Sequence, residues 1–293
     1  MVRFVVLAAF LVAACGSFGP AQPETLSLAY KAGDTYKYRF HATSKQAANM
    51  SGMSVPIQLD TSANETVDVK SVDSGGTADL AITLSDLTLK TVAAGITNTT
   101  SGMPANTVEV KIRADGTVVA IDGKSLMSGS PLAAFSGIGG GFFIAAVLPD
   151  NAVKVGDRWS KTYDQSDPDG FGTVHITSTS TYVRDETVDN VTTAVVETKS
   201  NGRIDFTGPT SSSHATDAGL SMNGTFTTDV TTWIDAGAHR IVKSHSTAHD
   251  DVTLNFPTML PPSPDKTATP TPMPFMQGPI TATGDSTTDL TSA

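Results

Sequence analysis

The sequence predicts a mainly β protein made of two similar antiparallel, curved, half-barrel-like sheet units with a short helical apolar segment between them. Three observations support this prediction: charged residues make up only 16% of the chain, apolar and polar residues alternate in many segments, and one motif occurs twice. With so few charges, the surface must consist largely of Thr, Ser and Asn. β-Branched Thr fits the pleated surface of a sheet, and alternation with a period of two is typical of strands with one buried face.

The repeated motif is Lys-x-Gly-Asp-x-aromatic, at residues 31–36 and 154–159. The two copies lie 154 − 31 = 123 residues apart. We interpret each copy as a tight Gly-Asp turn before a strand whose first inward side chain is a large ring. Two further turn sequences, Asp115-Gly116 and Asp235-Ala236-Gly237, have nearly the same offset, 235 − 115 = 120. The sequence therefore predicts an internal repeat of one β unit.

The first unit covers residues 25–123. Its strand patterns lie at residues 26–30, 36–44, 57–72, 108–113 and 118–121. A loop is predicted at 50–56 and a hairpin turn at Gly75-Gly76. After that turn, the alternation of apolar residues slips by one position at Ser85-Asp86 before it resumes. Such a slip predicts a β-bulge, which bends a strand and keeps its apolar face inward.

Residues 124–150 connect the two units and include the most apolar stretch outside the N-terminus. The stretch is too short, and too interrupted by the glycines at 137–141, to span a bilayer. We predict a helical connector that packs into the concave face of a sheet. Its large apolar side chains are candidates for lining an apolar-ligand site: Leu132, Phe135, Phe142, Phe143 and Leu148.

The second unit covers residues 151–293. Its strand patterns lie at residues 159–163, 174–183, 192–206, 225–234, 240–256 and 280–290. Residues 257–279 are rich in proline, which excludes regular structure and predicts an extended excursion between the last two strands.

The N-terminus has the order of a secretory signal, with one early positive charge, Arg3, an apolar run, and small residues before Cys15. The segment Leu-Val-Ala-Ala-Cys at 11–15 resembles the lipobox of bacterial lipoprotein precursors, whose Cys becomes the lipidated first residue. The resemblance implies a signal peptide over 1–15, a tether over 16–24, and attachment to the extracytoplasmic side of a bacterial membrane. Three acyl chains, which such lipoproteins carry, anchor a protein stably. An ordinary signal peptide and an uncleaved anchor remain alternatives.

Charge and motif content exclude several classes of function. The net charge is −10, and no cluster of Lys and Arg provides the footprint that nucleic acids need. We therefore expect no nucleic-acid partner. The chain has no Gly-x-Ser-x-Gly sequence and no phosphate-binding loop. We expect no cofactor and assign no catalytic residue.

Two groups of metal-capable side chains favour structural roles. His245 and His249 share a face of a predicted strand, where positions four apart are ~13 Å from each other, too far to bind one ion together. Asp164, Asp167 and Asp169 do not follow the EF-hand order and suit an ordinary turn. We therefore assign no metal site.

The layout of two Lys-x-Gly-Asp-x-aromatic openings and two Asp-Gly hairpins resembles an uncharacterised family of exported bacterial β-proteins with two repeats. A lipobox, long curved strands and an apolar plug are more distantly similar to lipoprotein carriers of the LolA type, whose half-barrels hold acyl chains. We expect a non-enzymatic, lipid-anchored protein that binds a lipid or other apolar ligand, or an envelope partner, in a concavity. The alternatives are a structural or interaction lipoprotein of the cell envelope without a cavity, and a hydrolase whose site is not visible in the sequence.

Overall fold

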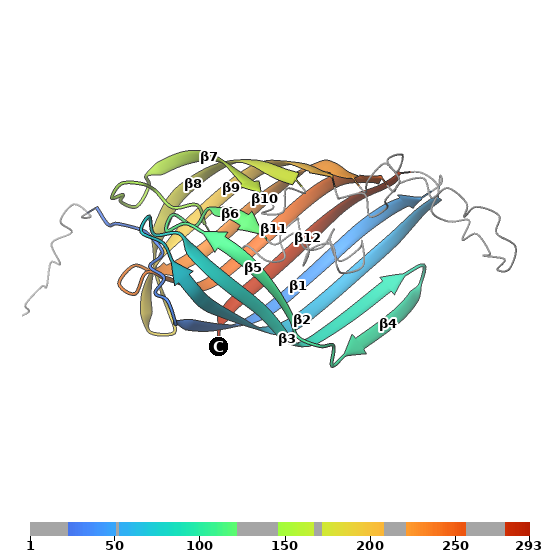
Figure 1. Cartoon of the computed structure of the whole chain (residues 1–293), viewed down its shortest axis with the longest axis horizontal. Helices are drawn as coiled ribbons and strands as arrows, with labels where there is room; N and C mark the ends of the chain where they lie inside the picture. The colour runs from blue at the N-terminus through green and yellow to red at the C-terminus, as the bar shows by residue number, and fades with distance from the viewer. Residues whose placement is uncertain (1–22, 51–52, 122–145, 167–171, 208–220, 256–278) are drawn as a thin grey trace, which may run out of the picture.

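The computed structural model describes residues 23–50, 53–121, 146–166, 172–207, 221–255 and 279–293. Within these ranges the chain forms twelve strands and no helix, which confirms the prediction of a mainly β fold. Figure 1 shows the strands arranged as one large curved sheet. The described part of the chain thus contains no helix with the length and hydrophobicity needed to cross a membrane.

The strands follow the chain in two groups. Before residue 122 they are β1 (Thr35–Met50), β2 (Met53–Val72), β3 (Ala78–Ala93), β4 (Ile96–Ser101), β5 (Asn106–Ile112) and β6 (Val118–Ile121). After residue 145 they are β7 (Arg158–Ser166), β8 (Gly172–Val188), β9 (Val191–Thr207), β10 (Ser221–Asp235), β11 (Arg240–Asn255) and β12 (Ile280–Ser292). Most of these strands overlap segments in which the sequence shows alternation.

All twelve strands belong to one sheet, in the order β2-β1-β12-β11-β10-β9-β8-β7-β6-β5-β3-β4, and β2 also pairs with β3. This additional pairing closes the sheet into a ring of eleven strands, with only β4 outside it. One edge of β3 pairs with β2, while the other pairs with β5 and then with β4. The sequence predicted two sheet units, whereas the structure joins all the described strands in one sheet.

The junctions of the ring differ in kind. Neighbouring strands are antiparallel everywhere except at β6 and β7, which are parallel and share a single residue pair, Ala120 and Ser166. By contrast, β1 pairs with β12 along most of both strands, from Tyr38 opposite Ser292 to Asn49 opposite Thr281. The ring is therefore joined most weakly on the two sides of the short strand β6, whereas its other junctions are longer antiparallel ladders.

The two copies of the repeated motif form the same turn. Gly33 and Gly156 have φ angles of 91° and 95°, which glycine adopts without a steric penalty. The N–H of Gly33 donates to the carbonyl of Val69 at 2.9 Å, and that of Gly156 donates to the carbonyl of Tyr182 at 2.7 Å. In both cases the acceptor lies on the strand that pairs with the one after the turn. The aromatic residue that ends each copy packs against the same apolar cluster.

β3 contains the bulge that the alternation predicts. Asn64 of β2 pairs with Ser85, and Ser62 pairs with Thr88, so β3 carries one more residue than β2 between these pairs. Asp86 has a positive φ of 52°, and its carboxylate accepts a hydrogen bond from Asn64 at 2.8 Å. The bulge bends β3 while the apolar residues on both sides of it stay on one face.

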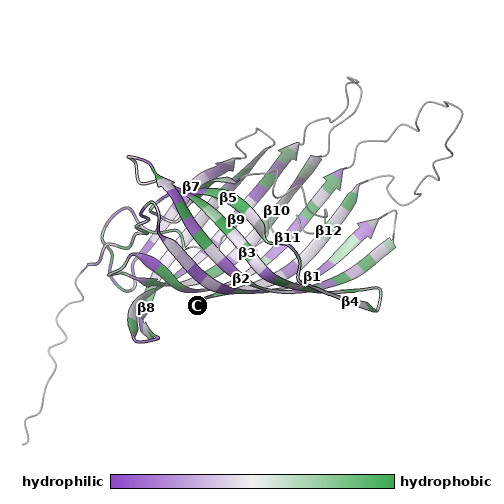
Figure 2. Ribbon diagram, turned by 60° about the horizontal axis from the view of Figure 1, so that its bottom comes forward, coloured by the Kyte–Doolittle hydropathy of each residue, from purple (hydrophilic) through white to green (hydrophobic). Residues whose placement is uncertain are grey.

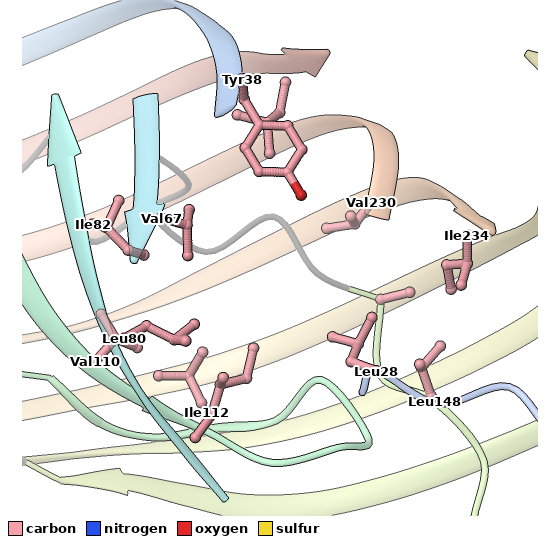
Figure 3. Packing of buried hydrophobic residues seen from close by; sticks show 14 of the residues in the cluster. Leu28, Tyr38, Val67, Leu80, Ile82, Val110, Ile112, Leu148, Val230 and Ile234 are labelled. Atoms are coloured by element: carbon pink, nitrogen blue, oxygen red, sulfur yellow. The ribbon is translucent and has the colours of Figure 1, made fainter. Parts of the chain in front are cut away.

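The main cluster is the larger of two groups of buried apolar side chains. Every strand of the ring contributes a buried or partly buried residue to it. Figure 3 shows labelled side chains from β1, β2, β3, β5 and β10 meeting there, together with Leu28 and Leu148 from irregular segments. Fully burying a side chain of this size stabilises a fold by ~1.5–3 kcal/mol. This region of the interior is a packed protein core.

The strand predicted at residues 26–30 is wrong. These residues form no strand, and Leu26 and Leu28 are instead buried in the main cluster. The N–H of Leu28 donates to the carbonyl of Ala114 at 2.7 Å, and Glu24 forms an isolated bridge with Val153. Alternating apolar residues suit a strand, but they also suit an irregular segment that fills the interior of a ring.

The loop predicted at residues 50–56 is also wrong, because β1 continues to Met50 and β2 already begins at Met53. Pro56 lies within β2, opposite Ala47 of β1. The pairing of β2 with β3 starts only at Ile57, so β2 has a free edge at the proline. A missing N–H is tolerated on a free edge.

Two further predictions fall largely outside the described residues. Only residues 146–150 of the helical connector are described, and they form no helix. Of the proline-rich excursion at 257–279, only Pro279 is described.

Candidate functional site

The inner face of the sheet carries a second apolar cluster, separate from the main one. Figure 2 shows how hydrophobic and hydrophilic residues alternate along the strands. Along β11, the buried residues run from Val242 through Ser244, which pairs with Leu290 of the main cluster, to Leu254 of the second cluster. The second cluster consists of Val174, Ile176, Ile204, Met222, Phe226, Val252, Leu254 and Ala282, with Tyr163, Phe206 and Ile280 packed against them.

The second cluster lies on one side of the ring only. All its members belong to β7, β8, β9, β10, β11 and β12, and none of the described residues of β1 to β6 belongs to it. The main cluster, in contrast, draws residues from all eleven strands of the ring and from two irregular segments. The second cluster is therefore an apolar wall without an opposite wall in the part of the chain that the structure describes.

The ring of Phe226 lies flat against the sheet in this wall. A Cβ atom at Gly202, on the neighbouring strand, would lie only 2.1 Å from carbons of the Phe226 ring. The ring therefore lies over Gly202, where any side chain would displace it. Glycine in a strand interior often marks such a close approach. The aromatic side chain thus covers two strands instead of projecting into the interior.

A belt of small hydroxyl residues separates the two clusters. We call it the hydroxyl belt; its buried members are Ser44, Ser178, Ser180, Thr198, Ser200, Thr232, Ser244, Ser246 and Thr288. Ser178 bonds to Ser200 and Ser180 bonds to Thr198, each with 2.8 Å between the hydroxyl oxygens. Because most buried polar groups need a partner, these pairs offset part of the cost of burial.

The segment at residues 146–148 crosses this belt on the inside of the ring. The N–H of Ala146 donates to the Thr232 hydroxyl at 3.1 Å, and the N–H of Val147 donates to the Thr198 hydroxyl at 3.3 Å. The carbonyl of Val147 accepts a hydrogen bond from the Trp159 indole at 2.8 Å. Residues 146–148 therefore lie inside the closed sheet.

Two carboxyl groups on the inner face are buried. Asp250 lies on β11 with 2% of its surface exposed, and burial raises its pKa to about 6. Glu65 lies on β2 opposite Tyr38 with 5% exposed, and burial raises its pKa to about 7. Neither group has an ion-pair partner among the described residues. Their burial disfavours the charged form, as expected for carboxylates without a cation nearby.

Lys161 is the inward-facing cation of β7, and it has partners. Its Nζ atom lies 2.7 Å from Asp115 and 2.6 Å from Asp150. Burial alone would lower the pKa of Lys161, but the two hydrogen-bonded carboxylates outweigh it and raise the pKa. Lys161 thus ties the turn between β5 and β6 to the chain before β7, and we assign it a structural role.

The outer face carries a hollow of about 580 Å³ over β9 to β12. Its lining includes His249, whose Nδ1 lies 2.8 Å from Asp285, and Lys199, which bonds to Asp229 at 2.8 Å. The hydrogen bond with Asp285 raises the pKa of His249. This hollow is open, polar and lined by exposed ion pairs, in contrast to the apolar inner face.

The histidines of the outer face pair with aspartates of neighbouring strands. His245 bonds to Asp289 at 2.8 Å, and His175 bonds to Asp164 at 2.6 Å. Among the described residues, no group of three or more His, Cys, Asp or Glu residues could hold a metal ion. In the same residues, no hydrogen bond joins a serine or threonine hydroxyl to a histidine that also bonds to a carboxylate. Such a chain is what a hydrolase triad would require.

Most of the predicted site residues lie outside the described part of the chain: Cys15, Leu132, Phe135, Phe142 and Phe143. Leu148 is described and has no exposed surface. It belongs to the main cluster, as Leu28 does (Figure 3), and it is not a member of the second cluster. Leu148 is thus part of the packed core and is not brought together with the second cluster.

The second cluster and Asp250 were missed as site residues. In the sequence, Asp250 stands beside His249 and Asp251 and seemed part of one polar group. The signal that would have separated it is the run Ala248-x-Asp250-x-Val252-x-Leu254, which places Asp250 on the apolar face of the strand.

Comparisons with known proteins assign no family to this chain. No protein-family model matches the sequence, and no curated protein matches it.

Proposed function

We propose that this chain is a lipid-anchored, extracytoplasmic, non-catalytic protein that binds an apolar ligand, such as an acyl chain, inside the closed sheet. The observation that carries the proposal is the second cluster, an apolar wall contributed by one side of the ring only. Ligand pockets are mostly apolar concavities with a few polar groups that fix orientation. The inner face, with its hydroxyl belt next to this wall, has that composition.

The size of the ring supports the proposal. Eleven strands spaced ~4.8 Å apart and tilted by ~40° would place opposite backbones roughly 20 Å apart in a round ring. Sheets in direct contact lie ~10 Å apart. In the main cluster, the irregular segments through Leu28 and Leu148 fill the difference. Next to the second cluster, the described residues include no such segment, and the proposal assigns this part of the interior to the ligand and to residues before Ala146.

The proposal includes the apolar residues before Ala146 as the opposite wall: Leu132, Phe135, Phe142 and Phe143. Their support is the path of the chain, because residues 146–148 already lie on the inner face and bond to the hydroxyl belt. A ligand would then lie between these side chains and the second cluster.

We also propose that the ring arose from two similar units joined by a short apolar segment. The matching turns at Gly33 and Gly156 support this, since each precedes the first strand of a unit and bonds to the next strand in the same way. In this description β1, β2, β3, β5 and β6 correspond to β7 through β11, and β12 closes the ring against β1.

Binding of the apolar fluorophore 1-N-phenylnaphthylamine tests the proposal. The full chain carries Cys15→Ser in this experiment, so that no acyl group of its own competes with the probe. We expect saturable binding, which Leu254→Asn weakens roughly tenfold because one large apolar contact is lost. The matched control is Thr253→Asn, the next residue of β11, whose side chain lies on the opposite face.

Saturable binding that is unaffected by Leu254→Asn would place the probe elsewhere and overturn the proposed site. Absence of binding would favour a structural or interaction lipoprotein without a cavity. Lipid extracted from protein purified from membranes, identified by mass spectrometry, would define the natural ligand class.

The anchor is tested separately by Cys15→Ala. We expect this variant to leave the membrane fraction, because the acyl chains attach only to the cysteine that follows the lipobox. A variant that stays with the membrane would show that the lipobox interpretation is wrong.

A further inference from the structure

Asp250 lies at the boundary between the hydroxyl belt and the second cluster. On one side of it along the inner face of β11 come Ala248 and Ser246, and on the other side come Val252 and Leu254. Across the sheet it pairs with Phe226 on β10, a member of the second cluster, and with a glycine on β12. The carboxyl group therefore lies where an apolar surface meets a polar one.

The carboxyl group of Asp250 is buried without a partner. Within the part of the chain that the structure describes, neither of its oxygens has a hydrogen-bond partner, although only 2% of the residue is exposed. The adjacent Asp251 faces outward, accepts a hydrogen bond from the Thr283 hydroxyl at 2.5 Å and lies 3.8 Å from His249. A buried carboxylate that lacks such donors is costly, and native proteins rarely keep one without a reason.

The residue opposite Asp250 on β12 has no side chain, and a side chain from β1 lies over it. The partner of Asp250 on β12 is Gly284, so no side chain stands next to it on that strand. A Cβ atom at Gly284 would lie 2.6 Å from Cγ of Gln46, which shows that the Gln46 side chain leans across the glycine from β1. One amide-bearing side chain and one carboxylate thus flank the same glycine.

We propose that Asp250 binds the polar head of an amphipathic ligand whose apolar tail lies on the second cluster. This inference rests on the proposed function and adds the class of ligand, a long-chain amphiphile with a hydrogen-bond-donating cationic head such as a primary ammonium. An ionised carboxylate accepts hydrogen bonds and donates none, so it selects donors and repels carboxylate or sulfate heads. The hydroxyls of the belt supply further polar contacts for the head.

The pKa of Asp250, raised to about 6 by burial, still leaves the group ionised at pH 7.5. A cationic head beside it would favour the charged form further. Three titratable residues on the outer face have smaller effects on this pKa. His249 lowers it, whereas Asp251 and Asp285 raise it.

Competition between the fluorophore and two amphiphiles with the same tail tests the inference at pH 7.5. Dodecylammonium and dodecanoate displace 1-N-phenylnaphthylamine from the Cys15→Ser full chain and from the same chain carrying Asp250→Asn or Asp251→Asn. We expect the parent chain to bind dodecylammonium at least about tenfold more tightly than dodecanoate, since a charge-assisted hydrogen bond is worth at least this factor. Asp250→Asn should reduce the preference to about twofold or less.

Asp251→Asn is the matched control, because it removes the same charge from the neighbouring residue on the outer face. A chain with a net charge of −10 attracts any cation, and this control subtracts that general attraction. We expect it to keep the preference of the parent chain. A second variant, Asp250→Ala, should lose the preference as Asp250→Asn does, and thermal unfolding confirms that each variant is folded.

An equal preference in Asp250→Asn and Asp251→Asn would overturn the inference, as would a parent chain that binds both amphiphiles alike. Either result, with saturable fluorophore binding intact, would leave the proposed function standing. A parent chain that binds neither the fluorophore nor the amphiphiles would overturn both.

Discussion

The main cluster and the second cluster are built on the same sheet from the same kinds of side chain, yet they face different surroundings. Strands from all around the ring and two irregular segments enclose the main cluster. The second cluster draws only on the strands from β7 to β12. Both contain fully buried isoleucines, Ile234 in the first and Ile204 in the second.

This difference teaches that low exposure alone does not define a core. A core residue is surrounded on all sides by parts of the fold that are fixed by other contacts, so removing it leaves a cavity. A residue on a one-sided wall shares its surface with whatever occupies the interior. The two clusters should therefore respond differently to the same substitution.

Replacing Ile234 by Ala should give the largest effect. We expect the free energy of unfolding to fall by about 2–5 kcal/mol, the usual range for a large-to-Ala change in a packed core. Ile204→Ala should lower the free energy of unfolding by less, about 1–2 kcal/mol. Ile204 belongs to the second cluster, which has no opposite wall among the described residues. Urea denaturation of the ligand-free chain measures both values.

The same pair of variants also separates the clusters by binding. Ile204→Ala should weaken fluorophore binding several-fold, whereas Ile234→Ala should leave the affinity of the folded protein unchanged. Equal losses of stability, with no change in binding for either variant, would show that the second cluster is an ordinary core.

Glu65 sharpens the comparison through pH. Burial raises its pKa from the ordinary 4.5 to about 7, so the unfolded chain releases this proton at a lower pH than the folded protein does. Stability should therefore fall as pH rises from about 4.5 to 7. Glu65→Gln should raise the free energy of unfolding at pH 8 by about 1–3 kcal/mol and change it by less than ~0.5 kcal/mol at pH 4. A variant that is less stable at both pH values would show that the carboxylate has a stabilising partner.

His249, on the outer face behind the second cluster, should give the smallest effect. Its hydrogen bond to Asp285 raises its pKa above 6.5, so the pair stabilises the fold below that pH and loses its effect as pH rises through the raised pKa. Both side chains are well exposed, at 49% and 79%. We therefore expect His249→Asn to cost no more than ~0.5 kcal/mol at pH 5.5 and nothing measurable at pH 9. A loss above 1 kcal/mol, measured by thermal unfolding, would assign the outer hollow a larger structural role.

Much of the strand content could be predicted from the sequence, because each strand leaves a local pattern. The bulge at Ser85 and Asp86 appears as a slip in alternation, and Gly33 and Gly156 mark turns that only glycine enters freely. The loop predicted at residues 50–56 was wrong, because these residues include the end of β1 and the start of β2, with Pro56 inside β2. Whether proline is tolerated depends on a free strand edge, which depends in turn on pairing with a distant segment.

The candidate site could not be predicted in the same way. Leu26 and Leu28 have the alternation of a strand, but the closed ring uses them to fill its interior. Alternation along β11 places Asp250 on the apolar face, but that pattern does not show that the carboxyl group lacks a partner there. Pairings between distant strands decide what surrounds Asp250 and where Leu26 and Leu28 pack, and alternation within one segment carries no information about these surroundings.

The pairing of β1 with β12 has a consequence for the order of folding. It joins Tyr38 to Ser292, so ring closure brings together segments from nearly opposite ends of the described chain. Contacts so distant in sequence form late and slow folding, because the entropy of a long loop must be lost first. After β1, β2 and β3 have paired, the outer edge of β1 stays unpaired until the last strand of the chain forms. The interior cannot be sealed until β12 arrives, and until then that edge is open to wrong partners.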